Sequence, residues 1–540
     1  MGRSVNKFYL TTPLYYVNSK PHIGHAYTEI AADTLARYHR LASNEDVKFL
    51  TGTDEHGQKV DKAAREAGMM PREFTDKISL TFRDLWKTLN ISHDDFIRTT
   101  EARHVKAVQA VWRELEKRGE IYKAKYAGWY CTPDETFLTE GQLVRENGQV
   151  LCPDCNRPVE KIEEENYFLK LSKHHAWLAG EIRGGKNLRI LPETRRNEVL
   201  GFLDNNELQD LCISRPKNRL SWGIPLPISD AHVTYVWFDA LINYISAVGY
   251  GADEKILKKW WPVDVHLIGK DILRHHAVYW PILLKALDLP LPKMIFAHGW
   301  WVQGGEKMSK SRGNVTDPRD IIAAYGVDAF RYFLLREAPF GSDGTFSEEA
   351  LILRYNTDLA NDLGNLLHRT LTMCEKYFGG RVPDYKERSG ASSVEKNALK
   401  LMVAGDEMID AVDTAMGTLA FSEALGAIWD VISRANKFIE ESAPWTLFKE
   451  KKSFDLELVI LTLSEVLRDT AQAVWPFMPH TAEAMWTQLG LTFPIDRLEK
   501  TPAKAHTTFG VKIAKGAPLF PRIEIEKNPT EVPPNNGHTG

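Results

Sequence analysis

The segment KFYLTTPLYYVNSKPHIGHAYTEIAADTLARYHRL, residues 7–41, has the pattern of a strand, a tight loop and a helix. Residues 7–16 form a short apolar run, and residues 21–41 repeat apolar side chains with helical spacing. A second apolar run at 47–50 ends in the polar sequence TGTDEHG at 51–57. Strand, helix and strand in this order predict the start of a parallel α/β sheet of Rossmann type.

The α/β pattern stops and later resumes, which predicts a sheet built from two parts of the chain. Residues 118–225 are short runs broken by Gly, Pro and Cys, and we interpret them as an insertion with its own small fold. Strand-like runs return at 232–237, 266–269 and 294–297. After about 330, helical periodicity takes over and predicts a bundle, with one apolar helix face formed by Phe421, Leu425, Ile428, Ile432, Ala435 and Ile439.

Composition limits the class of protein. The 540 residues, 43% of them apolar, allow roughly three or four globular domains at ~150 residues each. A net charge of -4 gives no basic footprint, so any RNA contact depends on local patches. Neither a signal-peptide pattern nor a run of ~18 apolar residues occurs, which predicts a cytoplasmic protein without membrane association.

The five cysteines are too few and too unevenly spaced for a disulfide framework in a chain of this length. They predict a reducing compartment. Cys212 and Cys374 have no partners in sequence and are predicted to be core residues.

Two polar clusters far apart in the chain each suit phosphate. His22 and His25 lie at i and i+3 in the first turn of the predicted helix, whose N-terminus favours anions, and Gly24 leaves the backbone open to a flat group. The stretch GGEKMSKSRG at 304–313 carries three cations and two hydroxyls, as expected for a loop that closes on phosphates. Taken alone, the first cluster could be a surface pair or half a zinc site, and the second a solvated basic loop.

Together, in this order, the clusters resemble the paired signature of the class I aminoacyl-tRNA synthetases. His22 and His25 match the first motif, and Lys307 and Lys310 match the second. The chain further resembles the methionyl-tRNA synthetase family from residue 5 to about 480, through TTPLYYVNSKPHIGH, TGTDEHGQKV, WGIPLP, YVWFDALINY, HLIGKDILRHHAVYWP, AHGWW, DAFRYFLLRE and ESAPW. The absence of a GxxxxGK[ST] pattern argues against an ordinary P-loop NTPase.

The resemblance implies a methionine pocket in which a carboxylate holds the ammonium group and aromatic and imidazole walls enclose the thioether. By motif match this pocket consists of Leu14, Tyr16, Asp54, Trp237, Ala240, Leu241, Tyr244, His276 and Trp280. Leu241 and His275 stand where some members have Pro and Phe. Without the resemblance, these aromatics would be interpreted as core packing.

The resemblance also implies the reaction, which is ATP-dependent ligation of L-methionine to tRNA(Met) through methionyl-adenylate, with release of AMP and pyrophosphate. ATP would be bound, with Mg²⁺, by residues of the two motifs: His22, Gly24, His25, Lys307 and Lys310. All of these except Gly24 would also act in catalysis. Two alternatives stay open, a class I synthetase for another apolar or sulfur amino acid and a non-catalytic tRNA-binding paralogue. The insertion of about 100 residues is too short for the editing domain of the Leu, Ile and Val enzymes.

The insertion contains a candidate metal knuckle. Cys152 and Cys155 form a CxxC turn, and Cys131 with Asp134 forms a CxxD half upstream. Four ligands at these spacings can enclose one tetrahedral Zn²⁺ with a structural role. Zinc-bearing members of the family usually have Cys or His at the position of Asp134. The alternative is three reduced cysteines in a knuckle held by its own hydrogen bonds.

The helical region carries the residues that the resemblance assigns to the anticodon. Asn365 and Arg369 are i and i+4 on one predicted helix, and Trp445 follows Pro444 at the end of another. In the family the matching residues read the CAU anticodon, with the Trp stacked on a base and the polar pair bonded to base edges. Without the resemblance they would be a surface helix pair and a packing residue.

The resemblance adds functions to the predicted domains. The regions are a Rossmann catalytic domain in two halves (1–117 and 226–330), an inserted connective domain with the Cys knuckle (118–225), a stem-contact linker (331–380), a helical anticodon-binding domain (381–526) and a disordered tail (527–540). Longer members dimerise through an appended β-barrel that this sequence does not show, so a monomer is predicted.

Overall fold

The structure is a computed structural model, and it divides into two compact units. One unit is Met1–Thr345 with Met416–Ser422, and the other is Phe346–Ala415 with Glu423–Gly540. The residues that the structure describes are 7–42, 46–131, 136–138, 140–146, 148–153, 155–303, 306–307, 317–384, 392–496 and 507–524.

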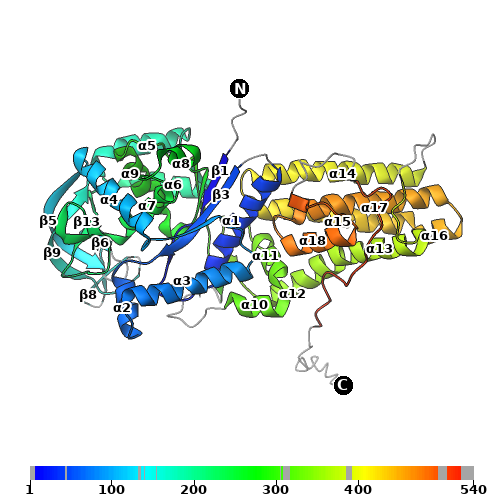
Figure 1. The fold of residues 1–540 in the computed structure, drawn as a ribbon, viewed down its shortest axis with the longest axis horizontal. Helices are drawn as coiled ribbons and strands as arrows, with labels where there is room; N and C mark the ends of the chain where they lie inside the picture. The colour runs from blue at the N-terminus through cyan, green and yellow to red at the C-terminus, as the bar shows by residue number, and fades with distance from the viewer. Residues whose placement is uncertain are drawn as a thin grey trace, which may run out of the picture. The chain divides into compact units, whose positions relative to one another are not determined.

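A seven-stranded parallel sheet forms the centre of the first unit (Figure 1), as the sequence predicts. The strand order is β10-β16-β15-β1-β3-β2, and β4 also pairs with β3. These strands are β1 (Lys7–Thr11), β2 (Tyr15–Tyr16), β3 (Asp46–Asp54), β4 (Asp95–Arg98), β10 (Arg189–Leu191), β15 (Val265–Gly269) and β16 (Met294–His298).

Strand β1 lies at the point in the sheet where the order of the strands reverses. It pairs with β3 on one side, with Thr11 opposite Leu50, and with β15 on the other, with Thr11 opposite His266. The loops that leave β1 and β15 therefore diverge, and the crevice between them at the carboxyl ends of the strands is where open α/β sheets bind ligands.

Helix α1 (Ile23–Ala42) is tied to helix α11 (Val327–Arg336) by a buried ion pair. The Nη2 atom of Arg331 lies 2.8 Å from Oδ2 of Asp33, and neither side chain is exposed. Arg37 also donates to Asp33. Burial alone would raise the pKa of Asp33, but Arg331 and Arg37 outweigh it and hold that pKa below its usual range. The first unit accordingly extends to Thr345, past the division predicted at 330.

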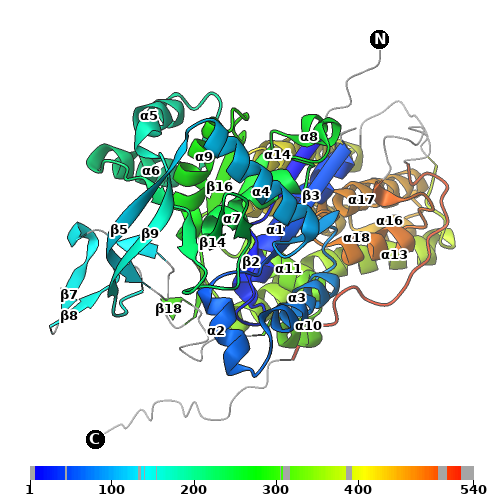
Figure 2. The same cartoon turned by 60° about the vertical axis from the view of Figure 1, so that its left-hand side comes forward.

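The predicted insertion consists largely of antiparallel strands, and Figure 2 shows the β7–β8 hairpin near the end of the long β5–β9 pair. One four-stranded sheet contains β5 (Ile121–Cys131), β6 (Thr136–Leu138), β9 (Glu160–Leu169) and β11 (Leu211–Cys212). The hairpin pairs Val144–Glu146 with Gln149–Leu151. Residues 189–191 differ from the prediction, because β10 pairs with β16 at the edge of the main sheet.

The prediction that residues 232–237 form a strand of the main sheet is wrong. Strand β14 (Ser229–Thr234) lies in a separate antiparallel sheet with β12 (Ser214–Pro216) and β13 (Pro225–Leu226), and Trp237 belongs to helix α7 (Val236–Ser246). An antiparallel partner needs only a short connection, whereas a parallel one needs a long crossover. A short apolar run also does not distinguish a strand from the first turn of a buried helix.

The remaining elements of the first unit surround these sheets. They are α2 (Gln58–Glu66), α3 (Pro71–Thr88), α4 (Ala102–Lys117), α5 (His175–Gly184), α6 (Glu193–Asn205), α8 (Glu254–Trp260), α9 (Trp280–Ala286), α10 (Pro318–Tyr325), β17 (Trp301–Gln303), β18 (Glu306–Lys307) and β19 (Gly344–Thr345).

The second unit is helical, as predicted (Figure 1). The predicted apolar face of α15 is confirmed, because all six of its residues are buried. Among the described residues, no helix combines the length and the apolar character needed to cross a lipid bilayer. The helices of this part of the chain are α12 (Glu348–Arg354), a π-helix (Tyr355–Gly364), α13 (Asn365–Phe378), α14 (Ser393–Met416), α15 (Phe421–Ser442), α16 (Pro444–Lys449), α17 (Ser453–Val474) and α18 (Pro479–Gln488).

Replacing Arg331 by Met is expected to lower the free energy of unfolding by about 3–5 kcal/mol, because it leaves the Asp33 carboxylate buried without its main counter-charge. Urea denaturation measures this change. The control is Arg434→Ala, which breaks a 2.8 Å pair with Asp430 between exposed side chains. That loss should stay within about 1 kcal/mol. Equal losses in the two variants would contradict the prediction.

Candidate active site

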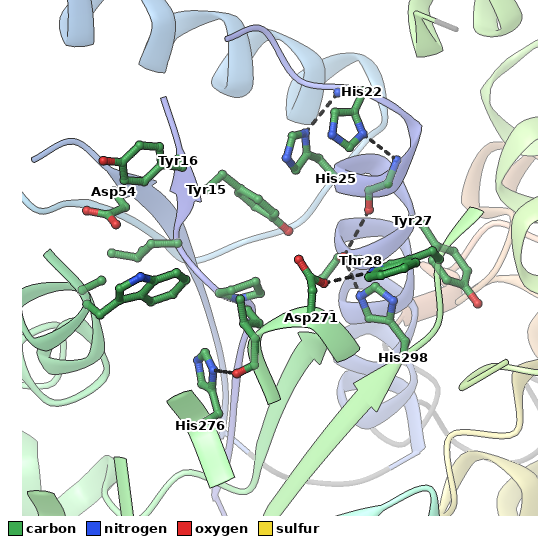
Figure 3. A pocket seen from close by; sticks show the side chains of 18 of the residues that line it. Tyr15, Tyr16, His22, His25, Tyr27, Thr28, Asp54, Asp271, His276 and His298 are labelled. Carbon is green, nitrogen blue, oxygen red and sulfur yellow. Dashed lines mark hydrogen bonds between the residues drawn. The ribbon is translucent and has the colours of Figure 1, made fainter. Parts of the chain in front are cut away.

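A cavity of about 320 Å³ opens at the carboxyl ends of β1 and β15, within the size range of small-molecule sites (Figure 3). It joins the phosphate motif at one end to the predicted methionine residues at the other. The predicted residues that line it are Leu14, Tyr16, His22, Gly24, His25, Asp54, Trp237, Ala240, Leu241, Tyr244 and His276.

The histidine pair occupies the start of α1, as the sequence predicts. The rings of His22 and His25 lie with their centroids 3.8 Å apart, and both side chains are partly exposed. The His22 backbone N–H points at Nδ1 of His25, and the Gly24 N–H points at Nδ1 of His22. A Cβ on Gly24 would lie 2.9 Å from the His22 ring, so glycine is needed here for the imidazole to keep its place. Two imidazoles thus face one side of a helix N-terminus.

The opposite end of the cavity has a carboxylate beside aromatic walls. Asp54, the last residue of β3, is 4% exposed, and Tyr16 lies opposite it in the strand register. The Tyr16 hydroxyl donates to the backbone carbonyl of His56 at 3.0 Å. The Trp237 ring stacks on His275 at 3.9 Å. A primary ammonium group and an apolar side chain can be held at such a site.

His276 presents a neutral imidazole to this end. Burial lowers its pKa to about 4, so the ring is uncharged near neutral pH. Its Nδ1 lies 3.1 Å from the Ile272 carbonyl, which can only accept, so Nδ1 carries the proton. The Tyr244 hydroxyl must then donate to Nε2, at 2.7 Å. The wall is therefore polar but uncharged, which suits a thioether better than an ionised side chain.

Trp280 is the one predicted methionine residue outside the cavity lining. It is fully buried, meets Tyr244 edge-on at 5.7 Å, and donates its indole N–H to Nε2 of His266 at 3.1 Å. His266 in turn lies 2.7 Å from the Thr11 hydroxyl, at the end of β1. Trp280 therefore supports Tyr244 from behind.

The second phosphate cluster, residues 304–313, lies mostly outside the described residues. Lys307 ends β18, which pairs with β17, but its side chain is not described, and Lys310 lies outside the described residues.

The sequence interpretation missed several residues that line the cavity, among them Thr28, Asp271, His298 and Trp300. Thr28 and His298 lie 2.8 Å apart below the histidine pair, and the Trp300 indole donates to Asp271 at 3.1 Å. Asp271 and His298 stand at the carboxyl ends of β15 and β16, where ligand-binding residues of such sheets gather, and this rule could have found them.

A buried carboxylate fixes the wall formed by α7. Asp239 has no exposed surface and lies 2.7 Å from Nδ1 of His56 and 2.6 Å from Nε2 of His104. Burial opposes its ionisation, but the two histidines outweigh this effect and lower its pKa. Since His56 follows β3 and Asp239 lies between Trp237 and Leu241, the network joins the Asp54 loop to the aromatic wall.

A second buried carboxyl group, Glu29, lies on α1 one turn beyond His25. It is fully buried, and its Oε1 atom accepts hydrogen bonds from Thr12 at 3.0 Å and from Thr51 at 2.5 Å. Burial raises the pKa of Glu29 from 4.5 to about 7, although the hydroxyl groups partly offset this. Near neutral pH, the Glu29 side chain is thus a mixture of the neutral acid and the carboxylate.

The predicted cysteine cluster is brought together by the fold. The Sγ atoms of Cys131, Cys152 and Cys155 lie within 4.8 Å of one another, and those of Cys131 and Cys155 are 3.5 Å apart. Thiolates bound at ~2.3 Å to one tetrahedral Zn²⁺ lie about 3.8 Å apart, so this donor set fits zinc. The fourth predicted ligand, Asp134, lies outside the described residues. Cys212 and Cys374 are buried, as predicted.

The predicted anticodon residues lie on two helices of the second unit, and a third helix contacts one of them. Asn365 and Arg369 are on α13, and Arg369 donates to Glu440 of α15 at 2.6 Å. Trp445, on α16, is 47% exposed. Tyr377 of α13 stacks on Phe448 of α16, so these two helices are in contact.

Comparison with known proteins identifies the family. Residues 8–371 match the family described as tRNA synthetases class I (M), and residues 405–509 match the anticodon-binding domain of tRNA ligase. The chain is 50% identical over 523 residues to the methionine–tRNA ligase of Caldanaerobacter subterraneus subsp. tengcongensis, which covers 96% of this chain and 79% of that protein. The chain belongs to the methionine–tRNA ligase family. The Bacillus subtilis methionine–tRNA ligase is 46% identical over 540 residues, covering 98% of this chain and 79% of the relative.

A solved structure agrees. Mycobacterium tuberculosis methionyl-tRNA synthetase in complex with methionyl-adenylate has a TM-score of 0.90 and 40% identity, covering 96% of this chain and all of that one. The resemblance of this chain to the methionyl-tRNA synthetase family, inferred from its sequence motifs, is confirmed, and so is the predicted fold class.

Replacing Glu29 by Gln is expected to raise the free energy of unfolding at pH 8 and to leave it nearly unchanged at pH 5. The folded pKa of about 7 exceeds the ordinary 4.5, so ionisation between these values favours the unfolded chain. The shift corresponds to about 3 kcal/mol above this window. Urea denaturation at both pH values measures it.

The matched control for this prediction is Thr34→Val, which alters another buried polar side chain of α1 without a change of charge. Its effect should be the same at pH 5 and pH 8. Equal effects of Glu29→Gln at both pH values would show that Glu29 does not titrate in this range.

Proposed function

We propose that this chain ligates L-methionine to tRNA(Met). The methionine carboxylate attacks the α-phosphorus of ATP and pyrophosphate leaves, which gives methionyl-adenylate. A hydroxyl of the 3′-terminal ribose of the tRNA then attacks the acyl carbon, and AMP leaves. The observation that carries this proposal is the single cavity that His22 and His25 line at one end and Asp54, Trp237 and His276 line at the other.

The residue roles follow from the chemistry of each end. His22 and His25 bind the phosphates of ATP, next to the open backbone at Gly24, while Lys307 and Lys310 stabilise the charge that develops on the reacting phosphorus. Mg²⁺ bound with ATP would supply further charge neutralisation. Since the methionine carboxylate is itself the nucleophile, no covalent intermediate with a side chain is required.

Methionine binding is proposed for the other end. Asp54 holds the ammonium group, and the thioether lies against the walls that Trp237, Tyr244 and His276 form, with Leu14, Tyr16, Ala240 and Leu241 completing the pocket and Trp280 supporting it. Each relative described above is named for methionine, which favours this substrate over another apolar or sulfur amino acid. The predicted cytoplasmic location and monomeric state stay predictions.

The experiment that tests the function is ATP–pyrophosphate exchange on the purified chain, with Met, Leu, Ile, Val and Cys in parallel. Exchange that depends on methionine alone is expected. Exchange with another amino acid would reassign the pocket, and no exchange with any of them, together with retained tRNA binding, would support a non-catalytic paralogue.

Replacing Trp445 by Ala is expected to weaken tRNA charging while leaving methionine-dependent exchange unchanged, because the indole is proposed to stack on an anticodon base. Loss of such a stack costs ~1–3 kcal/mol, or roughly 5- to 150-fold in kcat/KM for tRNA. Leu399→Ala, which truncates an apolar side chain that is also exposed, is the control and should charge normally. Equal damage to exchange and charging in the Trp445 variant would indicate misfolding.

Zinc content is expected to be about one ion per chain, held by the knuckle. Cys155→Ser removes one thiolate and should lower the zinc measured by plasma mass spectrometry severalfold and lower the melting temperature, because such small metal sites contribute folding energy. Cys212→Ala, outside the cluster, should retain the metal. A metal-free wild-type protein with the same melting temperature as the zinc-loaded protein would rule out a structural zinc.

A further inference from the structure

A buried polar pair that the proposed reaction does not use lies beside the cavity. Tyr15 lines the cavity from β2, and Figure 3 shows it between the Tyr16–Asp54 end and the His22–His25 end. The Tyr15 hydroxyl and the Oε2 atom of Glu29 are both buried, and neither has a hydrogen-bond partner within 3.5 Å in the described part of the chain.

The two groups face each other. Burial raises the pKa of both, and beyond this the Glu29 side chain raises that of Tyr15, while the phenol lowers that of Glu29. The other oxygen of Glu29 is already satisfied by the hydroxyls of Thr12, which follows β1, and Thr51 of β3. A hydrogen bond between the Tyr15 hydroxyl and Oε2 would therefore satisfy both groups, since a buried donor or acceptor left unpaired is costly.

The Tyr15 ring connects this pair to the phosphate end. It meets His25 edge-on at 5.0 Å and lies against Phe82 at 5.7 Å and Trp86 at 5.4 Å. Tyr15 also precedes Tyr16, whose backbone pairs with Asp54 at the methionine end. A displacement of the Tyr15 ring would thus act most directly on His25 at the phosphate end.

We propose that Glu29 is a positioning residue for the adenylate-forming step: its carboxyl group shares a hydrogen bond with the Tyr15 hydroxyl and so fixes the ring that lies against His25. The inference rests on the proposed function. The link can form in both protonation states, because the neutral acid donates to the phenol oxygen and the carboxylate accepts the phenol O–H.

The surroundings leave Glu29 without a strong counter-charge. It meets the neutral hydroxyls of Thr12, just after β1, and of Thr51 on β3, and from β2 the Tyr15 phenol. On its own helix the charged neighbour is Asp33, which Arg37 and Arg331 compensate. The proton state of Glu29 is therefore set by burial and by these hydroxyls.

The test uses the full chain and four single variants in methionine-dependent exchange at pH 6.5. Glu29→Gln keeps a donor toward Tyr15 and should stay within about twofold of wild-type kcat. Glu29→Met and Tyr15→Phe remove the link and should each lower kcat about tenfold, the scale of a small misplacement of a catalytic group. KM for methionine should change less than twofold, and Thr34→Val should match the wild type.

Two further measurements separate positioning from a structural role. The double variant Tyr15→Phe/Glu29→Met should be no slower than either single variant, because both break one link. Melting temperatures identify any variant whose loss of kcat results only from unfolding.

Wild-type kcat in Glu29→Met or Tyr15→Phe would overturn the proposal, as would equal losses in the Gln and Met variants or losses that multiply in the double variant. These outcomes require an active wild type, so they remove this inference and leave the proposed function intact. A wild type without methionine-dependent exchange would overturn both.

Discussion

The place of β1 between β3 and β15 is the constraint on which the site depends. The chain leaves β1 toward α1 and β3 on one side, and it returns through β15 and β16 on the other. Because all these strands are parallel, their carboxyl ends form one edge, and the loops after them converge there. His25, Asp54, Asp271 and His298 come from widely separated parts of the sequence and meet at that edge.

Convergence at a buried edge requires that polar groups leave water, and the fold compensates several of them locally. His276 stays neutral and is satisfied by a carbonyl and a phenol. Asp239 is charged and lies between two imidazoles. Asp33 is charged and lies between two guanidinium groups. Glu29 alone among these groups has only hydroxyl partners, which explains why its pKa rises while those of the two aspartates fall.

Local periodicity was sufficient to predict the order of the elements around residues 7–57 but not their bounds, because the apolar run at 7–16 divides into β1 and β2 and β3 continues to Asp54. It could not predict which sheet a strand joins. Residues 189–191 and 229–234 are both short strands, yet one pairs in parallel in the main sheet and the other antiparallel in a small one. That choice depends on partners elsewhere in the chain. The pocket residues were predictable through motif resemblance, whereas Thr28 and His298 required the strand ends to be known.

Burial separates residues that the sequence interpretation treated alike. Trp280 and Trp445 both came from motif match, and taken alone each would be interpreted as packing. In the structure Trp280 has no exposed surface, donates its indole N–H to a buried histidine and contacts Tyr244, which lines the cavity. Trp445 leaves almost half its surface in water on a short helix. An aromatic ring kept at the surface is available to stack on an unpaired base, whereas a ring in the core is not.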